Sequence, residues 1–357
     1  MLSPTDGWGI VAANGDRRGT LATTTDGGRT WHPAAPQGAC GPPTQLPAGP
    51  SLANSWTTSS TSAGNSEHTL VTVCHTTDGG RRWATIGRFH SIGTAGQPQF
   101  VDSRHGWLIT TPGGGMHSLS ETHLYRSVDG GRHWRQVAAA IPGLSGGHSI
   151  GGLPASCGSG EVRFADDQTG WYVGGCPQSG GLLTEGQTGW ARFLAVTHDG
   201  GTHWHSVQLP HPRIGGRRAG CWVGVACSVM LLALRPHLLE LFAGGGATAS
   251  PNVIYRSTDE GTTWTTEPLP LPSTEVATAN GTHLIQLSEE SRNVYASSDS
   301  GRTWQPLADL PHPAVSGPLP VDRRTAFATL AHSRGLYRTD DDGHTWRHVV
   351  AKLSPAW

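Results

Sequence analysis

Lysine is almost absent from this chain. Lys352 is the only one among 357 residues, so arginine supplies 24 of the 25 basic side chains. Charged residues make up 14% of the sequence, and the formal net charge is −1. This balance gives no electrostatic reason to expect binding to nucleic acid or to an anionic membrane. The preference for arginine has two explanations, the codon bias of a GC-rich genome or selection for planar groups that bind anions.

Long apolar runs are also missing. The longest uncharged apolar stretch, Ala219 to Leu234, has 16 residues and ends at Arg235-Pro236, so it is too short to span a bilayer. Two buried strands explain it better. Met1 is followed by neither a basic stretch nor an apolar core, and we therefore expect neither a signal peptide in this sequence nor a membrane span.

The sequence lacks the cysteine spacing of a zinc site. Its six cysteines include no Cys-x-x-Cys pair, so we expect no metal and no cofactor. An even number allows three disulfides, and free buried thiols are the alternative. Our prediction pairs sequence neighbours: Cys40 with Cys74, Cys157 with Cys176, and Cys221 with Cys227.

What the sequence does contain is an eight-residue segment that occurs seven times, which we call the box. The first copy, TTDGGRTW, runs from Thr24 to Trp31, and every copy fits Ser/Thr-x-Asp-x-Gly-x-x-Trp. The box aspartates and tryptophans are Asp26 and Trp31, Asp78 and Trp83, Asp129 and Trp134, Asp199 and Trp204, Asp259 and Trp264, Asp299 and Trp304, and Asp341 and Trp346. Such regularity indicates a structural element.

The box has the chemistry of a tight turn between two strands. Its aspartate can accept hydrogen bonds from nearby backbone N–H groups, and the glycine two residues later, as at Gly28, can adopt a positive φ. Apolar or β-branched residues precede the turn, and a tryptophan followed by an alternating run comes after it. We therefore expect each box to join two antiparallel strands, with its tryptophan filling a seam between neighbouring sheets.

The spacing of the boxes predicts the architecture. Successive box aspartates lie 40 to 70 residues apart, which suits blades of four short strands. A second turn motif, ending in Gly-Trp at Trp107 and Trp171, precedes some of the boxes. We predict an all-β, seven-bladed propeller of four-stranded antiparallel blades, forming one domain over residues 1–357. In the third blade, strands are expected at 99–101, 106–111, 123–128 and 133–138.

The first blade lacks an apolar strand before its Gly-Trp turn, because the chain starts at that turn with Pro4 to Trp8. Two explanations are open. Either the strand precedes the present start, together with any signal peptide, or the segment from Val349 to Trp357 supplies it and closes the ring. The first explanation agrees with the location that we expect for this protein, which is outside the cytoplasm: in the periplasm, in the cell envelope or secreted.

The strand order predicts two faces. Boxes and the turns between first and second strands belong to one rim, whereas the long insertions belong to the other, which we call the long-loop face. Loops on a rigid scaffold usually carry function, so this face is the candidate binding surface. Its candidate residues are Arg217, Arg218, Trp222, Trp190, Glu185 and Glu121.

The boxes resemble the Asp boxes, or BNR repeats, of sialidases. The Gly-Trp turns, together with LYRSVDGGRHW and GLYRTDDDGHTW, look more like the photosystem II stability/assembly factor group of propellers. The resemblance covers essentially the whole chain and implies the fold more than an activity, because Asp boxes in sialidase-like proteins are structural turns remote from the catalytic centre. The assembly-factor likeness implies a protein partner, with a membrane-complex subunit as one kind.

Catalytic readings have specific requirements. A sialidase needs a tyrosine nucleophile, yet four of the five tyrosines hold one repeat position, and Tyr172 follows Trp171 inside a strand, where packing explains it. Other glycoside hydrolases need two converging carboxylates. His203 and His205 alternate on one strand and could chelate a metal, although His203 holds a variable box position. The carboxylates expected on the long-loop face are Glu121, Glu185, Glu240, Glu275, Glu289 and Glu290.

We therefore predict a non-catalytic, monomeric binding or assembly scaffold from a bacterium, whose long-loop face binds a protein partner. A glycoside hydrolase and a carbohydrate-binding propeller remain as alternatives. An aromatic platform of Trp56, Trp190 or Trp222 without a carboxylate pair would favour sugar binding.

Overall fold

The computed structural model describes residues 1–11, 20–34, 36, 40–41, 46–62, 69–112, 119–141, 148–157, 160–178, 189–210, 212–214, 216–218, 227–235, 238–245, 252–270, 274–278, 282–288, 291–307, 309–330, 335–349 and 352–353. Within these ranges there is no helix with the length and apolarity that crossing a membrane requires.

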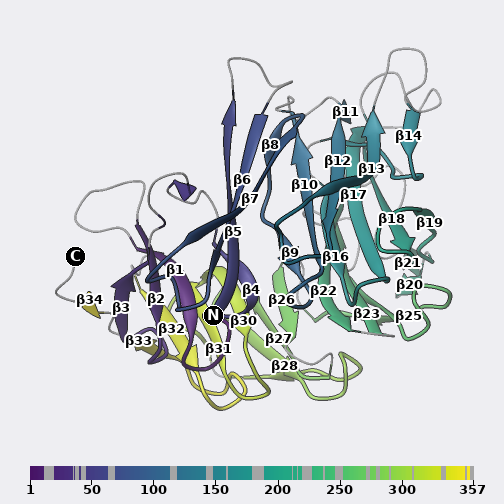
Figure 1. Cartoon of the computed structure of the whole chain (residues 1–357). Coiled ribbons are helices and arrows are strands. Elements are labelled where there is room, and N and C mark those ends of the chain that lie inside the picture. Colours follow the sequence, from purple (N-terminus) through teal and green to yellow (C-terminus); the bar gives the residue numbers. More distant parts are fainter. Residues whose placement is uncertain are drawn as a thin grey trace.

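Seven sheets, antiparallel except for the pairing of β34 in the first, follow one another along the chain, and we number them as blades 1 to 7 (Figure 1). Blade 1 contains β1 (Gly7–Val11), β2 (Thr20–Thr24), β3 (Thr30–Pro33) and, from the other end of the chain, β34 (Lys352–Leu353). Blade 2 contains β4 (Ala48–Ser51), β5 (Asn54–Ser62), β6 (Thr69–Thr76) and β7 (Ala84–Ser91). Blade 3 contains β8 (Thr94–Ala95), β9 (Gln99–Phe100), β10 (Gly106–Thr111), β12 (Thr122–Ser127), β13 (Arg135–Ile141) and β14 (His148–Ile150).

The other four blades have four strands each. Blade 4 contains β16 (Glu161–Phe164), β17 (Gly170–Gln178), β18 (Gly189–Thr197) and β19 (His205–Val207). Blade 5 contains β22 (Cys227–Arg235), β23 (Leu238–Gly245), β24 (Val253–Ser257) and β25 (Thr265–Pro268). Blade 6 contains β26 (Thr274–Thr278), β27 (Leu284–Ser288), β28 (Val294–Ser297) and β29 (Gln305–Pro306), and blade 7 contains β30 (Ala314–Pro320), β31 (Ala326–Leu330), β32 (Leu336–Thr339) and β33 (Arg347–Val349).

Two small ribbons lie between the blades: β11 (Leu119–Ser120) pairs with β15 (Ser156–Cys157), and β20 (Arg213–Ile214) pairs with β21 (Arg217–Arg218). The predicted seven-bladed all-β propeller is confirmed. In blade 3, the strands expected from the sequence agree with β9, β10, β12 and β13 to within a few residues, and only the short flanking strands β8 and β14 were not predicted.

The last blade meets the first. Arg338 in blade 7 donates a hydrogen bond from Nη1 to the carbonyl of Pro4, which enters blade 1, at 2.7 Å. β34 pairs in parallel with the outer strand β3 of blade 1, with Lys352 opposite Thr30. Figure 1 shows the yellow C-terminal blade beside the purple N-terminal strands. The described residues Lys352–Leu353 therefore lie at the outer edge of blade 1 and do not take its inner-strand position, which was one of the two explanations for that blade.

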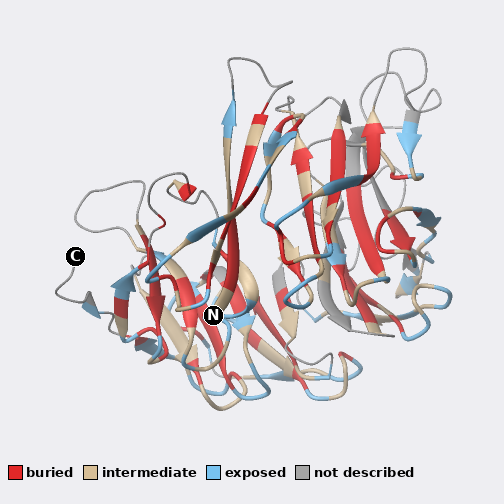
Figure 2. Ribbon diagram, in the orientation of Figure 1, coloured by how far each residue is buried: buried red, intermediate tan, exposed pale blue. Residues whose placement is uncertain are grey.

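The apolar core is divided among the seams between successive blades. At the seam between blades 3 and 4, Trp107 and Leu124 pack with Phe164 and Tyr172, and the Trp107 and Phe164 rings stack at 3.7 Å. Buried residues accordingly follow the middle strands of the sheets, and exposed ones gather at the turns and on outer strands such as β7 and β19 (Figure 2). The predicted position of the box tryptophans at the seams is confirmed for those of blades 2 to 7: Trp83, Trp134, Trp204, Trp264, Trp304 and Trp346.

Each box closes on its own side chains, as blade 3 illustrates. Asp129 Oδ1 accepts the backbone N–H of His133 at 3.0 Å, and Ser127 Oγ accepts that of Gly131 at 2.8 Å. Gly131 has a φ of 92°, as predicted, and Gly130 before it also has a positive φ of 76°. The N–H of Gly130 donates to the carbonyl of Arg104, in the turn between the first and second strands, at 2.9 Å. Both kinds of turn therefore share one rim, which we call the box rim.

The box hydrogen bonds predict acid sensitivity. Burial raises the pKa of Asp129, but hydrogen bonds from His133 and Ser127 outweigh it and lower that pKa to about 2. Hydrogen bonds in the other boxes likewise lower the pKa of each box aspartate below its ordinary value. The unfolded chain then takes up these protons first as the pH falls, so the stabilisation is complete above about pH 4 and is lost toward about pH 2.

We expect the urea midpoint of unfolding to change little between about pH 6 and pH 5 and to fall steeply between about pH 4 and pH 2. In the variant Asp129→Asn the fall should be smaller, because one of the titrating carboxylates is gone. A midpoint that stays constant down to pH 2 would show that the boxes do not stabilise the fold through their ionised carboxylates.

One of the three predicted disulfides is present. Cys40 and Cys74 are bonded, and both are buried. The bond ties the connection between blades 1 and 2 to strand β6. The side chains of Cys157, Cys176 and Cys227, and all of Cys221, lie outside the described residues, so the other two pairings stay predictions.

Candidate functional site

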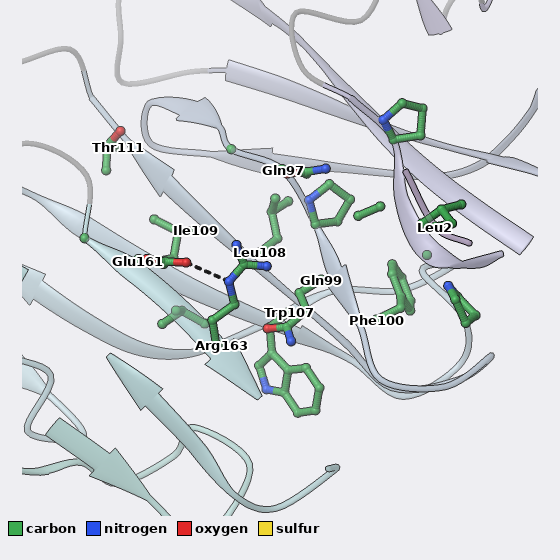
Figure 3. Close-up of a pocket in the computed structure, with 18 residues that line it drawn as sticks. Leu2, Gln97, Gln99, Phe100, Trp107, Leu108, Ile109, Thr111, Glu161 and Arg163 are labelled. Carbon is green, nitrogen blue, oxygen red and sulfur yellow. Dashed lines mark hydrogen bonds and ion pairs between the residues drawn. The ribbon is translucent and has the colours of Figure 1, made fainter. Parts of the chain in front are cut away.

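A cavity lies where the inner strands of blades 2, 3 and 4 converge. The first strands of successive blades approach one another, as β4 does β9 and β26 does β30, which places them around the axis of the propeller. The cavity has a volume of ≈ 690 Å³, and we call it the axial cavity (Figure 3). Its walls are Leu2, residues 47–50 before and in β4, residues 96–100 around β9, residues 107–109 and 111 of β10, and residues 160–163 at β16.

The local sequence keeps this space open. Residues 47–50 read Pro-Ala-Gly-Pro and residues 96–98 read Gly-Gln-Pro, so two of the three inner walls carry few bulky side chains. Proline is tolerated in such inner strands because they are the edges of their sheets and one side of the backbone has no strand partner. Because the side chains of these two walls are small, they leave space at the axis that larger side chains would fill.

The direction of the strands shows how the cavity lies. Each inner strand runs toward the turn that is bonded to a box, so it begins at the long-loop face and ends at the box rim. Pro47, Gly96 and Gly160 precede or begin the inner strands and thus lie at the long-loop end. Leu2 lies at the box end, and Figure 3 shows it on the side of the pocket opposite Thr111 and Glu161.

Two charged side chains on strand β16 line the axial cavity. Glu161 and Arg163 are two residues apart on β16, so the strand period places them on the same side. Arg163 Nε donates to Glu161 Oε1 at 2.7 Å, and the two side chains are 52% and 39% exposed. The attraction within such an exposed ion pair is weak, so both side chains can also form hydrogen bonds with a ligand.

Of the two glutamines in the wall, one is structural. Gln99 Oε1 accepts the N–H of Phe164 at 2.8 Å, and its Nε2 donates to the carbonyl of the same residue at 2.9 Å. The side chain thus acts as a short strand that locks blade 3 to blade 4. Gln97, which donates to the carbonyl of Leu46, is exposed at the long-loop end.

The arrangement suits binding more than hydrolysis. Among the described residues that line the axial cavity, Glu161 is the only carboxylate, and glycoside hydrolysis by two carboxylates needs a second one at about 5–10 Å. Arg163 can donate to a carboxylate or carbonyl oxygen, and Glu161 can accept from an amide. Leu2 and Ile109 add apolar surface. Together these groups can hold an extended chain of alternating polar and apolar character.

Of the six candidates from the sequence, Glu121 is the one whose side chain is described. Glu121 accepts a hydrogen bond from the buried His123 at 2.9 Å and is not part of the cavity wall. Arg217 and Arg218 form strand β21, and Trp190 lies on β18 opposite Pro177, but their side chains are outside the described residues. Glu185 and Trp222 lie wholly outside them.

One expectation about an exposed residue was wrong, and one residue named for a sugar platform is buried. Glu240 was placed on the long-loop face, but it is fully buried near the start of β23 and pairs with Arg256. The strand that carries it begins at the box rim, because the long insertion follows β23 rather than precedes it. Trp56 cannot serve as part of a sugar platform, since it is 1% exposed and stacks on Phe100 at 3.9 Å.

Two packing interpretations fit the structure. Tyr172 is fully buried at the seam of blades 3 and 4, as expected for a packing residue. His203 Nδ1 lies 2.6 Å from Asp199 Oδ2 of its own box, so it belongs to the turn. In the part of the chain that the structure describes, no group of three metal-binding side chains comes together.

The sequence reasoning missed the residues of the axial cavity. Glu161, Arg163 and Gln97 lie on or before inner strands, whereas the candidates from the sequence were chosen in the long loops. A signal was available, because the Glu-Val-Arg alternation before a Gly-Trp turn places two charges on one side of an innermost strand.

The comparisons with known proteins agree with the fold. No family model matches the chain, and no curated protein matches it. The solved structure of YCF48 bound to a D1 peptide has 17% sequence identity and a TM-score of 0.54, over 96% of this chain and 91% of that one. YCF48 from Cyanidioschyzon merolae has 15% identity and a TM-score of 0.51, over 95% and 92% of the two chains.

An α-L-arabinofuranosidase from Fusarium graminearum is more distant, with 12% identity and a TM-score of 0.44 over 85% of this chain and 86% of that one. At their identities, the two YCF48 structures show a shared fold alone.

Proposed function

We propose that this chain is a non-catalytic binding scaffold that takes up an extended peptide segment of a protein partner in the axial cavity, entering from the long-loop face. The observation that carries the proposal is the wall of the cavity: an accessible Glu161–Arg163 pair beside apolar surface, formed by inner strands whose ends lie at the long-loop face. The YCF48 structure, a propeller of the same fold that holds a D1 peptide, supports this kind of ligand.

We also propose that the protein works outside the cytoplasm of a bacterium. The Cys40–Cys74 disulfide supports this location, because disulfides persist in oxidising compartments and are rare in the cytosol. The repeats resemble those of BNR or Asp-box propellers and of photosystem II assembly factors, and we propose that this chain is a propeller of that kind. A single copy of the chain contains the whole cavity wall, which is compatible with a monomer.

Selection from a phage-displayed library of random peptides tests the function. We expect enrichment of sequences that bind the purified protein. We expect Arg163→Ala to weaken their binding by about ten- to a hundredfold, because a hydrogen bond to a charged group contributes about 1.5–3 kcal/mol. Arg292→Ala is the matched control, since Arg292 is similarly exposed at 54% and pairs with Asp309 away from the cavity. Equal losses in the two variants, or no enrichment at all, would argue against the axial cavity as a peptide site.

A panel of fluorogenic glycosides tests the alternative functions. We expect no turnover above that of a boiled sample. Turnover that disappears in Glu161→Gln would replace the scaffold by a glycoside hydrolase, because Glu161 is the carboxylate that the described wall provides.

A further inference from the structure

Blade 3 has another pocket, at the end of the blade where its box lies. The pocket is between Arg126 on β12 and Arg135 on β13, and its volume is ≈ 350 Å³. Val128, Trp134 and Val137 add apolar surface to its walls. β12, the box and β13 are described without a gap, and none of the described residues lines both this pocket and the axial cavity. We call it the blade 3 pocket.

The two arginines of this pocket face each other across the sheet. Arg126 and Arg135 are directly opposite in the register of β12 and β13, where like charges repel. Arg126 Nη2 donates to the carbonyl of Asp167 in blade 4 at 2.8 Å. Its Nε is buried and has no hydrogen-bond partner among the described residues. The guanidinium of Arg126 is therefore fixed in position with one donor unused.

Blade 7 repeats this arrangement and contains the group that blade 3 lacks. Arg338 and Arg347 are opposite each other on β32 and β33, and Arg338, like Arg126, donates to a carbonyl of the next blade. Asp340 lies between the two arginines of blade 7. Its Oδ1 accepts a hydrogen bond from Arg338 Nε at 2.7 Å, and its Oδ2 accepts one from Arg347 Nη2. A carboxylate thus neutralises the pair and binds the Nε that is unused in blade 3.

In blade 3 a valine replaces this aspartate. Val128 and Asp340 hold the same repeat position, directly before the box aspartate, and Val128 is 50% exposed. Among the described residues that line the blade 3 pocket, Asp129 is the only carboxylate. Its oxygens already accept hydrogen bonds from Ser127 Oγ and from the backbone N–H of His133. The arginine pair of blade 3 therefore lacks the carboxylate that its counterpart in blade 7 has.

Blade 5 supports the same comparison. Arg256, which also follows a repeat tyrosine, donates from Nε to Glu240 Oε1 at 2.7 Å, and Glu240 lies opposite it in the sheet. In blade 3 that opposite position belongs to Trp107, and the guanidinium carbon of Arg126 lies 5.6 Å from the centroid of its ring. In blades 5 and 7 the Nε of this arginine thus binds a carboxylate, and blade 3 is the exception.

We propose that the blade 3 pocket binds a carboxylate carried on a short apolar chain, as in a small aliphatic acid or in a glutamate of a peptide. The carboxylate takes the place between Arg126 and Arg135 that Asp340 holds in blade 7, and the apolar part contacts Val128 and Val137. Charge-assisted hydrogen bonds from two guanidiniums select for a carboxylate. This site is separate from the peptide site that we propose in the axial cavity.

The test compares two variants at the exposed Val128. Val128→Asp supplies the carboxylate from the protein itself, as in blade 7, and Val128→Asn is the matched uncharged control. Isothermal titration of the parent with isovalerate, or with the peptide acetyl-Gly-Leu-Glu-Leu-Gly-amide, should show one such site per chain. We expect Val128→Asp to weaken this binding about tenfold or more, because hydrogen bonds to a charged group are lost, and Val128→Asn to retain it.

Two further measurements use the same comparison between blades. Val128→Asp should have a higher urea midpoint than Val128→Asn, because its carboxylate relieves the repulsion between Arg126 and Arg135. Asp340→Val should create a second carboxylate site in blade 7, so that the stoichiometry for isovalerate rises from one to two per chain.

Equal binding in Val128→Asp and Val128→Asn, or no binding of either ligand to the parent, would overturn the proposal. A peptide that binds about tenfold or more tightly than isovalerate would identify an acidic side chain of a partner as the ligand, and equal affinities would identify a free acid. All titrations are repeated with Arg163→Ala, which removes the contribution of the axial cavity and should leave isovalerate binding unchanged. Failure at one site is therefore distinguishable from failure at the other.

Discussion

Replacing Arg256 with methionine is expected to lower the free energy of unfolding by about 3–5 kcal/mol, because it removes the arginine that pairs with a buried carboxylate. Glu240 is fully buried, and the Arg256 side chain is 14% exposed. Arg256 Nε donates to Glu240 Oε1 at 2.7 Å, and its Nη2 donates to the carbonyl of Ser300 in the next blade at 3.0 Å. The variant therefore loses both an ion pair and a contact across a seam.

Arg163 provides a matched control, because its hydrogen bond to a glutamate has the same length. Arg163 Nε also donates to a glutamate Oε1 at 2.7 Å, but that pair is exposed. Arg163→Met should cost no more than about 1 kcal/mol, since water solvates the glutamate that remains. The double variant Arg256→Met/Glu240→Leu should recover most of the stability, because neither charge is then buried alone. Urea unfolding of the three purified variants measures these changes in the free energy of unfolding. Equal losses in Arg256→Met and Arg163→Met would refute the role of burial.

Arg256 belongs to a pattern across the blades. Arg126 donates to the carbonyl of Asp167 in blade 4 at 2.8 Å, and Arg338 donates to that of Pro4 in blade 1 at 2.7 Å. Each follows a repeat tyrosine, in Tyr-Arg-Ser or Tyr-Arg-Thr. Blades 3, 5 and 7 are thus each fastened to the next blade by one guanidinium.

Local chemistry explains why the boxes were predictable. A box is closed by its own aspartate, hydroxyl and glycine, so its turn can be inferred from eight residues. Its tryptophan follows the turn directly, and the seam position follows from that. The positive φ of Glu260, Ser300 and Asp342 could not be predicted in this way, because the boxes of blades 1 to 4 have glycine there and the last three blades do not.

Contacts between blades explain what could not be predicted. The axial cavity combines Leu2, Gln97 and Arg163, which come from three blades and are brought together by the ring. Glu240 appeared to be a loop carboxylate because its partner Arg256 lies on another strand. The pairing of β34 with the outer edge of β3 likewise depends on where the two ends of the chain meet, which no local pattern specifies.

Removal of the Cys40–Cys74 disulfide is the second large effect. The two cysteines are separated by 34 residues, and the bond restricts the unfolded chain by closing that loop. The loop-entropy relation gives about 4 kcal/mol for this length, so Cys40→Ala/Cys74→Ala should lower the free energy of unfolding by about that amount. Alanine is the suitable replacement because both positions are buried and a serine hydroxyl there would need a new partner.

A comparison with and without dithiothreitol makes this test specific. Reduction should destabilise the parent by at least as much as the double variant loses, because it opens the same loop. If reduction also lowers the urea midpoint of the double variant, further disulfides exist, as predicted for Cys157 with Cys176 and Cys221 with Cys227. A double variant as stable as the parent would mean that the bond contributes nothing to the stability of the fold.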